Sequence, residues 1–281
     1  MNVSAVLLAS GNWRIKRTRF GLMAYNINDQ YIGRSLDCYG EYSRGEAQLF
    51  AQIVAPGAIA IDVGANIGAL TVFLAQAVGP QGRVIAFEPQ RVMYQLLCTN
   101  LALNEIANVQ ALCAGAGRTT GTAFMPRYDY AQSGNFGGVE LGSNQSRGVQ
   151  GEPVDIVSID SLKLPQCQFI KIDVEGQEDA VIAGAVETIT RCRPVLYVEN
   201  DRRDRSPNLI RQLQALDYVL YWHLPPLFAP DNFYGNPTNL WPGMMSIDML
   251  CMPKGDGRKI EGMRPVSGPD DVPFPEQRPR S

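Results

Sequence analysis

The stretch Ala58-Ile-Ala-Ile-Asp-Val-Gly-Ala-Asn-Ile-Gly-Ala-Leu-Thr-Val-Phe-Leu-Ala75 determines the fold of this chain, because it encodes a strand, a glycine turn and a helix in immediate succession. Residues 58–63 form a short apolar run, which is typical of a strand covered on both faces. Apolar residues then recur at helical spacing over 67–78. Gly64 and Gly68 allow a tight turn between the two, and the first amides of the helix point beyond the strand end. The pattern predicts a site for a nucleotide-like ligand on this turn.

The spacing of the glycines bears on the kind of nucleotide. The turn Gly64-Ala-Asn-Ile-Gly68 lacks the Gly-x-Gly-x-x-Gly pattern of dinucleotide sites, which disfavours a nicotinamide-dependent oxidoreductase without removing it as an alternative. One helix later, residues 83–89 read as a second strand that ends in Glu88. In a nucleotide-binding βαβ unit, an acid at this distance accepts hydrogen bonds from ribose hydroxyls. We therefore expect Glu88 to hold a ribose, the alternative being an exposed carboxylate at a strand end.

Three motifs resemble those of the FkbM-type methyltransferases, which use S-adenosylmethionine. They are Asp62-Val-Gly-Ala-Asn-Ile-Gly68, Phe87-Glu-Pro89 and Ile170-Lys-Ile-Asp-Val-Glu-Gly-Gln-Glu178. The similarity runs from about residue 39 to about residue 253. It implies a Rossmann-like class I methyltransferase fold, a mostly parallel seven-stranded sheet with helices on both faces, and O-methyl transfer to a hydroxyl of a small molecule or glycan. The expected cofactor site comprises Asp62, Gly64, Ala65, Asn66, Gly68, Glu88, Pro89, Ala114 and Asp173.

Length and composition favour a single domain over residues 1–253, with an N-terminal β-hairpin extension at 12–40. The tail 254–281 is rich in prolines and charges and is predicted to be disordered. The formal net charge of −3 provides no electrostatic footprint for a nucleic-acid partner. The six cysteines contain no Cys-x-x-Cys pair, and no signal segment or apolar run of membrane-spanning length is present. These features predict a cytoplasmic protein with free thiols and no membrane partner.

Alternating strands and helices predict a parallel sheet. Strands are expected near 58–63, 83–88, 109–113, 168–174 and 194–199, and helices near 44–53, 67–78, 91–103, 177–190 and 207–215. Two late strands, 218–222 and 246–252, would complete the sheet. The segments 125–150 and 223–245 are too long for ordinary connections, so we expect them to be functional loops at the carboxyl ends of the strands.

The strand near 168–174 carries the first candidate catalytic residues. A two-residue period places Lys171, Asp173 and Glu175 on one face. A lysine in a covered strand is costly unless it is paired, so Lys171 requires a carboxylate partner from a neighbouring strand. Asp173 lies nearer the strand end and is the better candidate for contacting a ligand, while Glu175 is assigned to the acceptor site. A purely structural ion pair is the alternative for Lys171.

His223 is the only histidine, and it directly follows a predicted strand at the entry to an aromatic loop. With an ordinary pKa of about 6.5, it is a candidate general base for removing the acceptor proton. Phe233, Tyr234 and Trp241 in the following loop are expected to close over the acceptor. The alternatives are a structural histidine and a small satellite core beneath the loop.

A metal site is a further alternative. Asp173 and the pair Glu199-Asn200 would bring three oxygen ligands to adjacent strand ends, which is similar to the magnesium site of catechol-type O-methyltransferases. Glu199 stands where an aspartate is expected there, and the FkbM resemblance itself implies no metal. A non-catalytic module that binds nucleosides or glycans also remains open at this stage.

Overall fold

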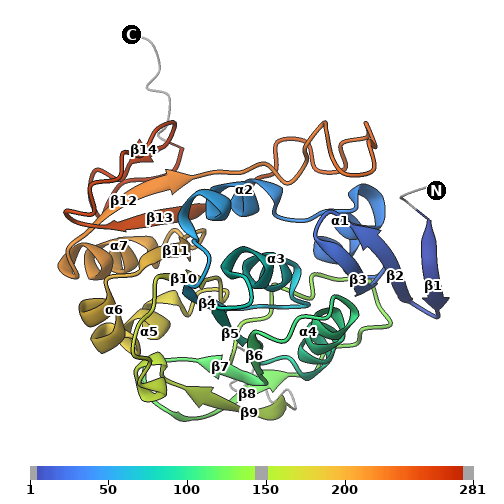
Figure 1. Ribbon diagram of the computed structural model, residues 1–281, viewed down its shortest axis with the longest axis horizontal. Helices are drawn as coiled ribbons and strands as arrows, with labels where there is room; N and C mark the ends of the chain where they lie inside the picture. The colour runs from blue at the N-terminus through green and yellow to red at the C-terminus, as the bar shows by residue number, and fades with distance from the viewer. Residues whose placement is uncertain (1–4, 143–150, 275–281) are drawn as a thin grey trace.

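The computed structural model describes residues 5–142 and 151–274, and its main feature is a sheet of eight strands with helices on both faces (Figure 1). In spatial order the strands are β14 (Arg264–Pro265), β12 (Tyr218–His223), β13 (Asp248–Pro253), β11 (Val195–Glu199), β10 (Phe169–Ile172), β4 (Ile59–Val63), β5 (Arg83–Phe87) and β6 (Val109–Leu112). Strands β11, β10, β4, β5 and β6 are parallel, and β13 is antiparallel to both β11 and β12. Apart from β14, this is the predicted Rossmann-like class I sheet of seven strands.

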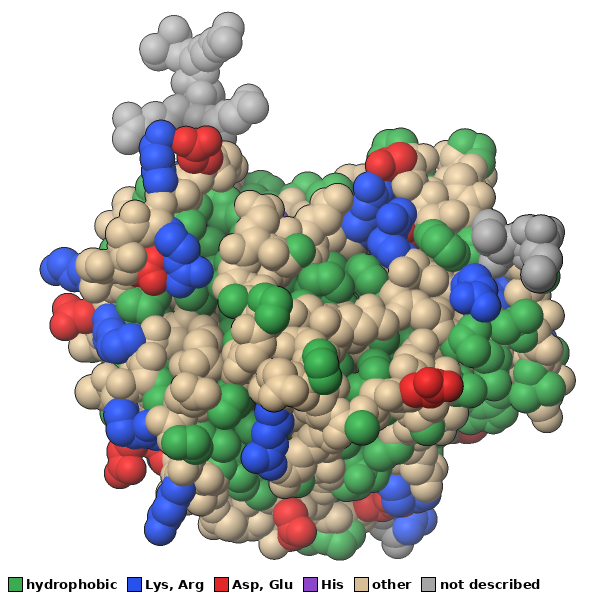
Figure 2. All heavy atoms as spheres, in the orientation of Figure 1, with side chains coloured by type: hydrophobic (Ala, Val, Ile, Leu, Met, Phe, Trp, Pro, Cys, Tyr) green, Lys and Arg blue, Asp and Glu red, His purple; other side chains and the backbone are tan. Residues whose placement is uncertain are grey.

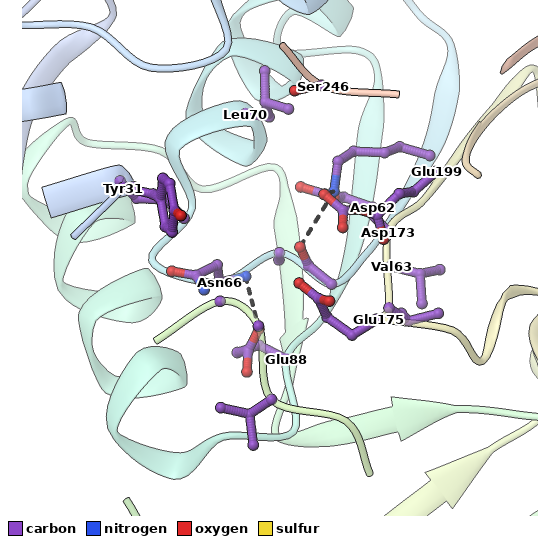
Figure 3. A pocket seen from close by; sticks show the side chains of 18 of the residues that line it. Tyr31, Asp62, Val63, Asn66, Leu70, Glu88, Asp173, Glu175, Glu199 and Ser246 are labelled. Atoms are coloured by element: carbon purple, nitrogen blue, oxygen red, sulfur yellow. Dashed lines mark hydrogen bonds and ion pairs between the residues drawn. The ribbon is translucent and has the colours of Figure 1, made fainter. Parts of the chain in front are cut away.

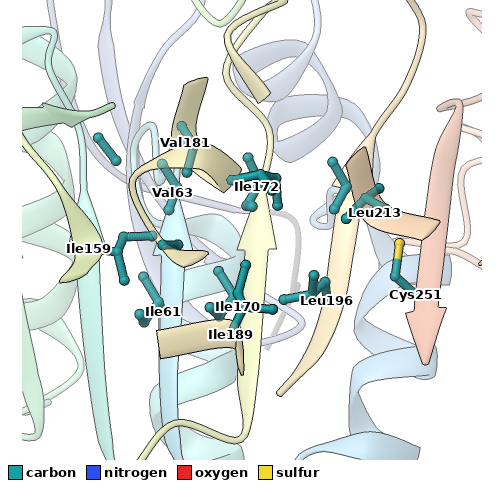
Figure 4. Packing of buried hydrophobic residues seen from close by; sticks show 14 of the residues in the cluster. Ile61, Val63, Ile159, Ile170, Ile172, Val181, Ile189, Leu196, Leu213 and Cys251 are labelled. Carbon is teal, nitrogen blue, oxygen red and sulfur yellow. The ribbon is translucent and has the colours of Figure 1, made fainter. Parts of the chain in front are cut away.

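Side chains alternate between the two faces of the sheet, and each face packs against a different set of helices. Ile61, Ile170 and Leu196 pack with residues of α5 (Glu178–Ala183), α6 (Val186–Cys192) and α7 (Ser206–Ala215), as Figure 4 shows. On the opposite face, apolar side chains pack with α2 (Arg44–Ile53) and α3 (Ala69–Val78), and α4 (Arg91–Leu103) lies beside α3. The parallel strands are thus covered on both sides, which explains their continuous apolar sequences.

The N-terminal segment forms a small antiparallel sheet of β1 (Val6–Ser10), β2 (Trp13–Thr18) and β3 (Gly21–Asn26). The predicted hairpin over 12–40 is confirmed for β2 and β3. It is wrong for α1 (Ile32–Tyr39), where Ile32, Leu36 and Tyr39 are all buried. Their spacing of four and three residues is that of a helix. The burial of this apolar stripe favours a helix over the strand that the alternation of apolar and polar residues predicts.

A third sheet was not predicted. It consists of β7 (Ala114–Ala116), β9 (Gly151–Val157) and β8 (Gly121–Pro126) in that spatial order, and the short 3-10 helix η2 (Ile159–Leu162) follows it. Strands β8 and β9 therefore flank the segment predicted as irregular over 125–150. Residues 143–150 of that segment lie outside the described residues.

The predicted disordered tail is partly wrong. Strand β14 pairs antiparallel with the outer edge of β12, and Val266 joins the core with 9% of its surface exposed. Arg264 forms an ion pair of 2.8 Å with Asp271. The open edge of β12 thus orders a segment whose composition alone suggested disorder, whereas residues 275–281 lie outside the described residues. Within 5–142 and 151–274, no helix has the length and apolar character needed to cross a membrane.

Candidate active site

A cavity of about 520 Å³ opens at the carboxyl ends of β4, β5, β10 and β11. Its volume falls within the range of ~300–1,000 Å³ that is usual for small-molecule sites. Both segments that were predicted to be functional loops contribute to its wall, the first through Val139 and Leu141 and the second through Leu227 and Met244. Strand β13 runs in the opposite direction, so it contributes its first residue, Asp248, to the cavity wall.

The glycine turn after β4 forms one side of the cavity. Gly64 has a φ of +80°, and a Cβ atom there would lie 1.8 Å from the carbonyl oxygen of Asp173, so the backbones of β4 and β10 approach too closely for any other residue. The backbone N–H of Asn66 donates a hydrogen bond of 2.7 Å to Oε2 of Glu88. The turn is therefore held by the acid at the end of β5, as Figure 3 shows.

Glu88 itself is 3% exposed, and burial raises its pKa to about 7. Its Oε1 accepts a hydrogen bond of 2.8 Å from the backbone N–H of Gln90, so each carboxylate oxygen has one backbone donor. A carboxylate offers about four acceptor positions, which leaves two for a ligand in the cavity. Two neighbouring hydroxyl donors, such as those of a ribose, fit this arrangement.

Most of the predicted cofactor residues line the cavity. They are Asp62, Gly64, Ala65, Asn66, Glu88, Pro89 and Asp173. Gly68 instead begins α3 and lies so close to α4 that a Cβ atom would approach Leu97 Cδ1 to 2.5 Å, which makes its role structural. Ala114 does not line the cavity, because its side chain is buried in the apolar core, while its neighbours Gly115 and Ala116 do.

Lys171 has the carboxylate partner that its burial required. Its Nζ lies 3.3 Å from Oδ1 of Asp62 on β4 and 3.3 Å from Oδ2 of Asp173, and it donates a hydrogen bond to the carbonyl of Gly64. Burial lowers the pKa of Lys171, but the charges of Asp173 and Asp62 outweigh burial and raise it above the ordinary value. Lys171 is therefore charged, and it ties together the three elements around the cavity.

Glu175 also lines the cavity, as predicted. Its carboxylate pairs with Arg202, which comes from the segment after β11. Burial raises the pKa of Glu175 to about 7, and the charge of Asp173 adds to the effect. The ion pair bridges the ends of β10 and β11 across one rim of the site.

Besides the exposed Asp201, three further carboxyl groups line the cavity, and two of these three were not predicted from the sequence. Glu46 comes from α2, Asp248 from the start of β13 and Glu199 from the end of β11. Burial raises the pKa of Glu46 to about 6 and those of Asp248 and Glu199 well above their ordinary values. A signal for Glu46 did exist, because it lies on the buried side of α2 with Leu49 and Phe50. Asp248 likewise interrupts an apolar run.

His223, the candidate general base, does not line the cavity. It faces a separate surface depression together with Gly45 and Gln48. Its Nδ1 lies 2.8 Å from Oη of Tyr197, which donates a hydrogen bond of 2.9 Å to Oδ2 of Asp248. Burial lowers the pKa of His223 to about 4. The ring therefore reaches the site only through Tyr197.

Phe233, Tyr234 and Trp241, the expected acceptor contacts, do not line the cavity either. Trp241 is 9% exposed and packs edge-on against Tyr39 of α1, and the hydroxyl of Tyr234 donates to the carbonyl of Arg17. The backbone N–H of Phe233 donates to Glu41 Oε2. Phe233 and Tyr234 are half-buried, and their rings face Arg19 and Lys16, respectively.

Two tyrosines line the cavity in place of these three aromatic residues. They are Tyr31, whose ring stacks on Trp241 at 6.5 Å between centroids, and the half-buried Tyr42. Trp241 therefore supports a cavity residue without lining the cavity itself.

The predicted metal site does not form. Asp173 and Glu199 line the cavity, but the amide of Asn200 donates hydrogen bonds to Oγ of Ser206 at 2.9 Å and to Sδ of Met249 at 3.3 Å. Over the ranges 5–142 and 151–274, no group of three or more His, Cys, Asp or Glu side chains is arranged to hold a metal ion. Asn200 belongs to the scaffold.

Comparison with known proteins gives a family match over the part of the chain that builds this cavity. A family model described as "Methyltransferase FkbM domain" matches residues 62–220, more than half of the chain. Methyltransferase sdnD of Sordaria araneosa is 28% identical over 156 residues, which cover 45% of this chain and 60% of that protein. Methyltransferase 1 of Beauveria bassiana is 27% identical over 142 residues, which cover 44% of this chain and 57% of that protein. The match thus spans less than two thirds of either relative.

Solved structures with a similar arrangement include methyltransferase FkbM from Methylobacillus flagellatus KT, with a TM-score of 0.45 and 19% identity over 73% of this chain and 50% of that chain. An S-adenosylmethionine-dependent O-methyltransferase from Thermotoga maritima has a TM-score of 0.44 and 16% identity, covering 88% of this chain and 79% of that chain.

Proposed function

The chain belongs to the FkbM methyltransferase family, and from this premise we propose that it transfers a methyl group from S-adenosylmethionine to a hydroxyl oxygen of a small molecule or glycan. The observation that carries the proposal is the hydrogen bond between the backbone N–H of Asn66 and Glu88. This hydrogen bond holds Glu88 at the floor of the cavity, beside the first backbone amides of α3. Glu88 keeps two acceptor positions for a ligand.

Different residues around the turn would hold different parts of the cofactor. Glu88 would accept hydrogen bonds from the two ribose hydroxyls. The apolar wall of Pro89, Ala116, Met125 and Leu141 would cover the adenine ring, and the turn at Gly64 leaves room for the methionine portion. When bound, S-adenosylmethionine supplies an electrophilic methyl group attached to a positively charged sulfur.

The chain's own residues then align the acceptor and accept its proton. Asp173 is the candidate for this contact, because its carboxylate lies at the end of β10 and its side chain is 42% exposed towards the cavity opening. Lys171 holds Asp173 through the ion pair of 3.3 Å and fixes its orientation. Loop 127–142 and the segment after β12 restrict the access of water.

The charge of the cavity argues for the class of acceptor. Carboxyl groups outnumber basic side chains among the described residues of the lining, which opposes the binding of a nucleic acid or another polyanion. On the face shown in Figure 2, Lys and Arg side chains occur in small groups beside Asp and Glu, without a broad basic patch. We therefore infer a neutral or cationic acceptor.

Equilibrium binding followed by turnover tests the proposal. Titration calorimetry with S-adenosylmethionine, S-adenosylhomocysteine and NAD should give binding for the first two and none for NAD. A panel of hydroxylated small molecules and sugars, assayed with methyl-labelled S-adenosylmethionine, should then give S-adenosylhomocysteine in proportion to labelled product. Binding of NAD alone would favour the oxidoreductase alternative, and binding of S-adenosylmethionine without turnover of any acceptor would favour the binding module.

A further inference from the structure

The cavity lining carries a strong excess of acidic groups. Among the described residues, eight carboxyl side chains line it, and two basic ones do. The acids are Glu46, Asp62, Glu88, Asp173, Glu175, Glu199, Asp201 and Asp248, and the basic residues are Lys171 and Arg202. A site for a neutral ligand does not require such an imbalance, so the partners of each acid need to be accounted for.

Ion pairs within the protein account for four of the acids. Lys171 pairs with Asp62 and Asp173. Arg202 pairs with Glu175 and with Asp201, the latter at 3.4 Å. Each basic group therefore already faces two carboxylates, so negative charge remains in excess around the other acids of the lining.

Glu88 lies on the ribose side of the turn and is held by two backbone amides. The remaining three acids are Glu46, Glu199 and Asp248. Across the described ranges, none of these three forms an ion pair with a lysine or an arginine. We call them the acidic triad.

Two oxygen atoms of the acidic triad are buried without any hydrogen-bond partner in the part of the chain that the structure describes. They are Oε2 of Glu46 and Oε2 of Glu199. Glu46 is 6% exposed, and the hydroxyl groups of Ser43 and Ser246 lie beside its carboxyl group. Asp248, 4% exposed, has the hydroxyl of Tyr197 as its donor. A buried acceptor without a donor is costly, and ionising a buried carboxyl group without a counter-charge costs more. A ligand that brings a positive charge with N–H or C–H donors removes both costs.

We propose that the acidic triad forms a cation subsite of the cavity, which takes the positively charged centre of a ligand, an ammonium or a sulfonium group. The inference rests on the proposed function, because the cavity is the one assigned to the methyl donor and acceptor. Two sources of this charge share the same chemistry. One is the sulfonium of the cofactor, and the other is an amino group on the acceptor.

Binding of a cation at the acidic triad is linked to proton release. The titratable groups around Glu46 are Lys171, Asp173, Asp248 and the phenol of Tyr42, with Asp62 beyond Lys171. Asp248 also faces Tyr197 and Glu199 from β11. His223 of β12 lies behind Tyr197. Most of these neighbours are acidic, so they and burial favour the protonated triad in the absence of a ligand. A bound cation favours the ionised form. Protons are therefore released on binding, and affinity rises with pH up to the raised pKa of each acid, about 6 for Glu46.

Calorimetry with three adenosyl ligands tests the cofactor source. S-Adenosylmethionine carries a sulfonium, sinefungin carries an amine at the same position, and S-adenosylhomocysteine is neutral there. If the sulfonium is the source, the two cationic ligands bind about tenfold or more tightly than S-adenosylhomocysteine at low salt. Titrations in buffers of different ionisation enthalpy should also show greater proton release for the cationic pair.

Glu46→Gln is the central variant, because it keeps the size of the side chain and removes its charge. It should weaken the cationic ligands about tenfold and leave S-adenosylhomocysteine within about twofold. Glu199→Gln provides an independent test if Glu46→Gln fails to fold. Glu261→Gln, at an exposed position with a 73% exposed side chain, is the matched control and should change nothing.

Ethanolamine and ethylene glycol test the acceptor source, both on the free protein and on the protein saturated with S-adenosylhomocysteine. Saturable binding of ethanolamine that Glu46→Gln abolishes, with no binding of ethylene glycol, assigns the subsite to an acceptor amine. The proposal is overturned if the three adenosyl ligands bind equally and ethanolamine does not bind, or if Glu46→Gln and Glu199→Gln weaken all three adenosyl ligands to the same extent. Absence of binding by every adenosyl ligand would instead contradict the proposed function, and the ethanolamine titration of the free protein would still decide the subsite.

Discussion

Nζ of Lys171 lies 3.3 Å from Oδ1 of Asp62, its register partner on the neighbouring parallel strand. Both side chains are almost fully buried, at 5% and 0% exposure, on the face of the sheet that α2 and α3 cover. The pair joins β10 to β4 directly below the glycine turn, and Lys171 also donates to the carbonyl of Gly64. The ion pair is thus part of the scaffold and part of the cavity at once.

We expect Lys171→Met to lower the free energy of unfolding by ~3–5 kcal/mol, because it leaves Asp62 as a buried charge without its counter-charge. Urea unfolding followed by circular dichroism measures this loss. The double variant Lys171→Met with Asp62→Leu should recover a large part of it, since apolar replacement of a whole buried pair is often close to neutral. Equal stability of the single variant and the parent protein would contradict the structural role of the pair.

Glu88→Ala should weaken binding of S-adenosylmethionine strongly while the protein stays folded. The substitution removes the acceptor for the ribose hydroxyls, and hydrogen bonds to a charged group contribute ~1.5–3 kcal/mol each. It also releases the backbone N–H groups of Asn66 and Gln90, which loosens the turn. Calorimetry on the folded variant, with Glu261→Ala as control, checks the expected loss. Unchanged affinity would show that Glu88 does not hold the ribose.

Asp173→Asn should reduce turnover far more than stability. The side chain of Asp173 is 42% exposed, so the ion pair with Lys171 contributes modestly to folding, whereas loss of the proton-accepting carboxylate typically costs ~10²–10⁴-fold in rate. The rate is measured as S-adenosylhomocysteine formed with an acceptor found in the panel, beside thermal unfolding of the same samples. Survival of activity, or a loss that merely follows the unfolded fraction, would remove Asp173 from the catalytic step.

His223→Gln should change the pH dependence of stability. The pKa of His223 is about 4 in the folded protein and about 6.5 in the unfolded chain. As pH falls, the imidazole is therefore protonated in the unfolded state before it is protonated in the folded state. His223 therefore destabilises the parent progressively between about pH 6.5 and pH 4, by ~1–3 kcal/mol after allowance for partial exposure.

The difference in unfolding free energy between parent and His223→Gln, measured at pH 7.5 and pH 5, isolates this effect from the carboxyl groups, whose raised pKa values act in the opposite direction. The variant should gain relative stability at pH 5. At pH 7.5 it should keep turnover within a few fold, because His223 lies outside the cavity. A constant difference across this pH range would contradict the burial of a neutral His223.

The elements around the proposed cofactor site could be predicted from the sequence, because their signals are local. The strand at 59–63, the turn at Gly64 and the helix at 69–78 follow from apolar periodicity and glycine spacing within a few residues. The acid at Glu88 follows from its place after the next strand. Even the partner of Lys171 was predictable in kind, because a lysine in a covered strand requires a nearby carboxylate.

Which side chains meet at the cavity depends on the order and direction of the strands. Strand β13 lies between β11 and β12 and runs in the opposite direction, so Asp248 reaches the cavity and His223 is displaced one strand further from β10. Glu46 arrives from a helix that precedes the whole sheet. Local patterns specify a strand and its buried face, but strand order and direction depend on packing between segments far apart in the chain. Because of that long-range packing, the position of His223 in the sequence suggested a base, whereas the folded chain brings carboxyl groups to the cavity.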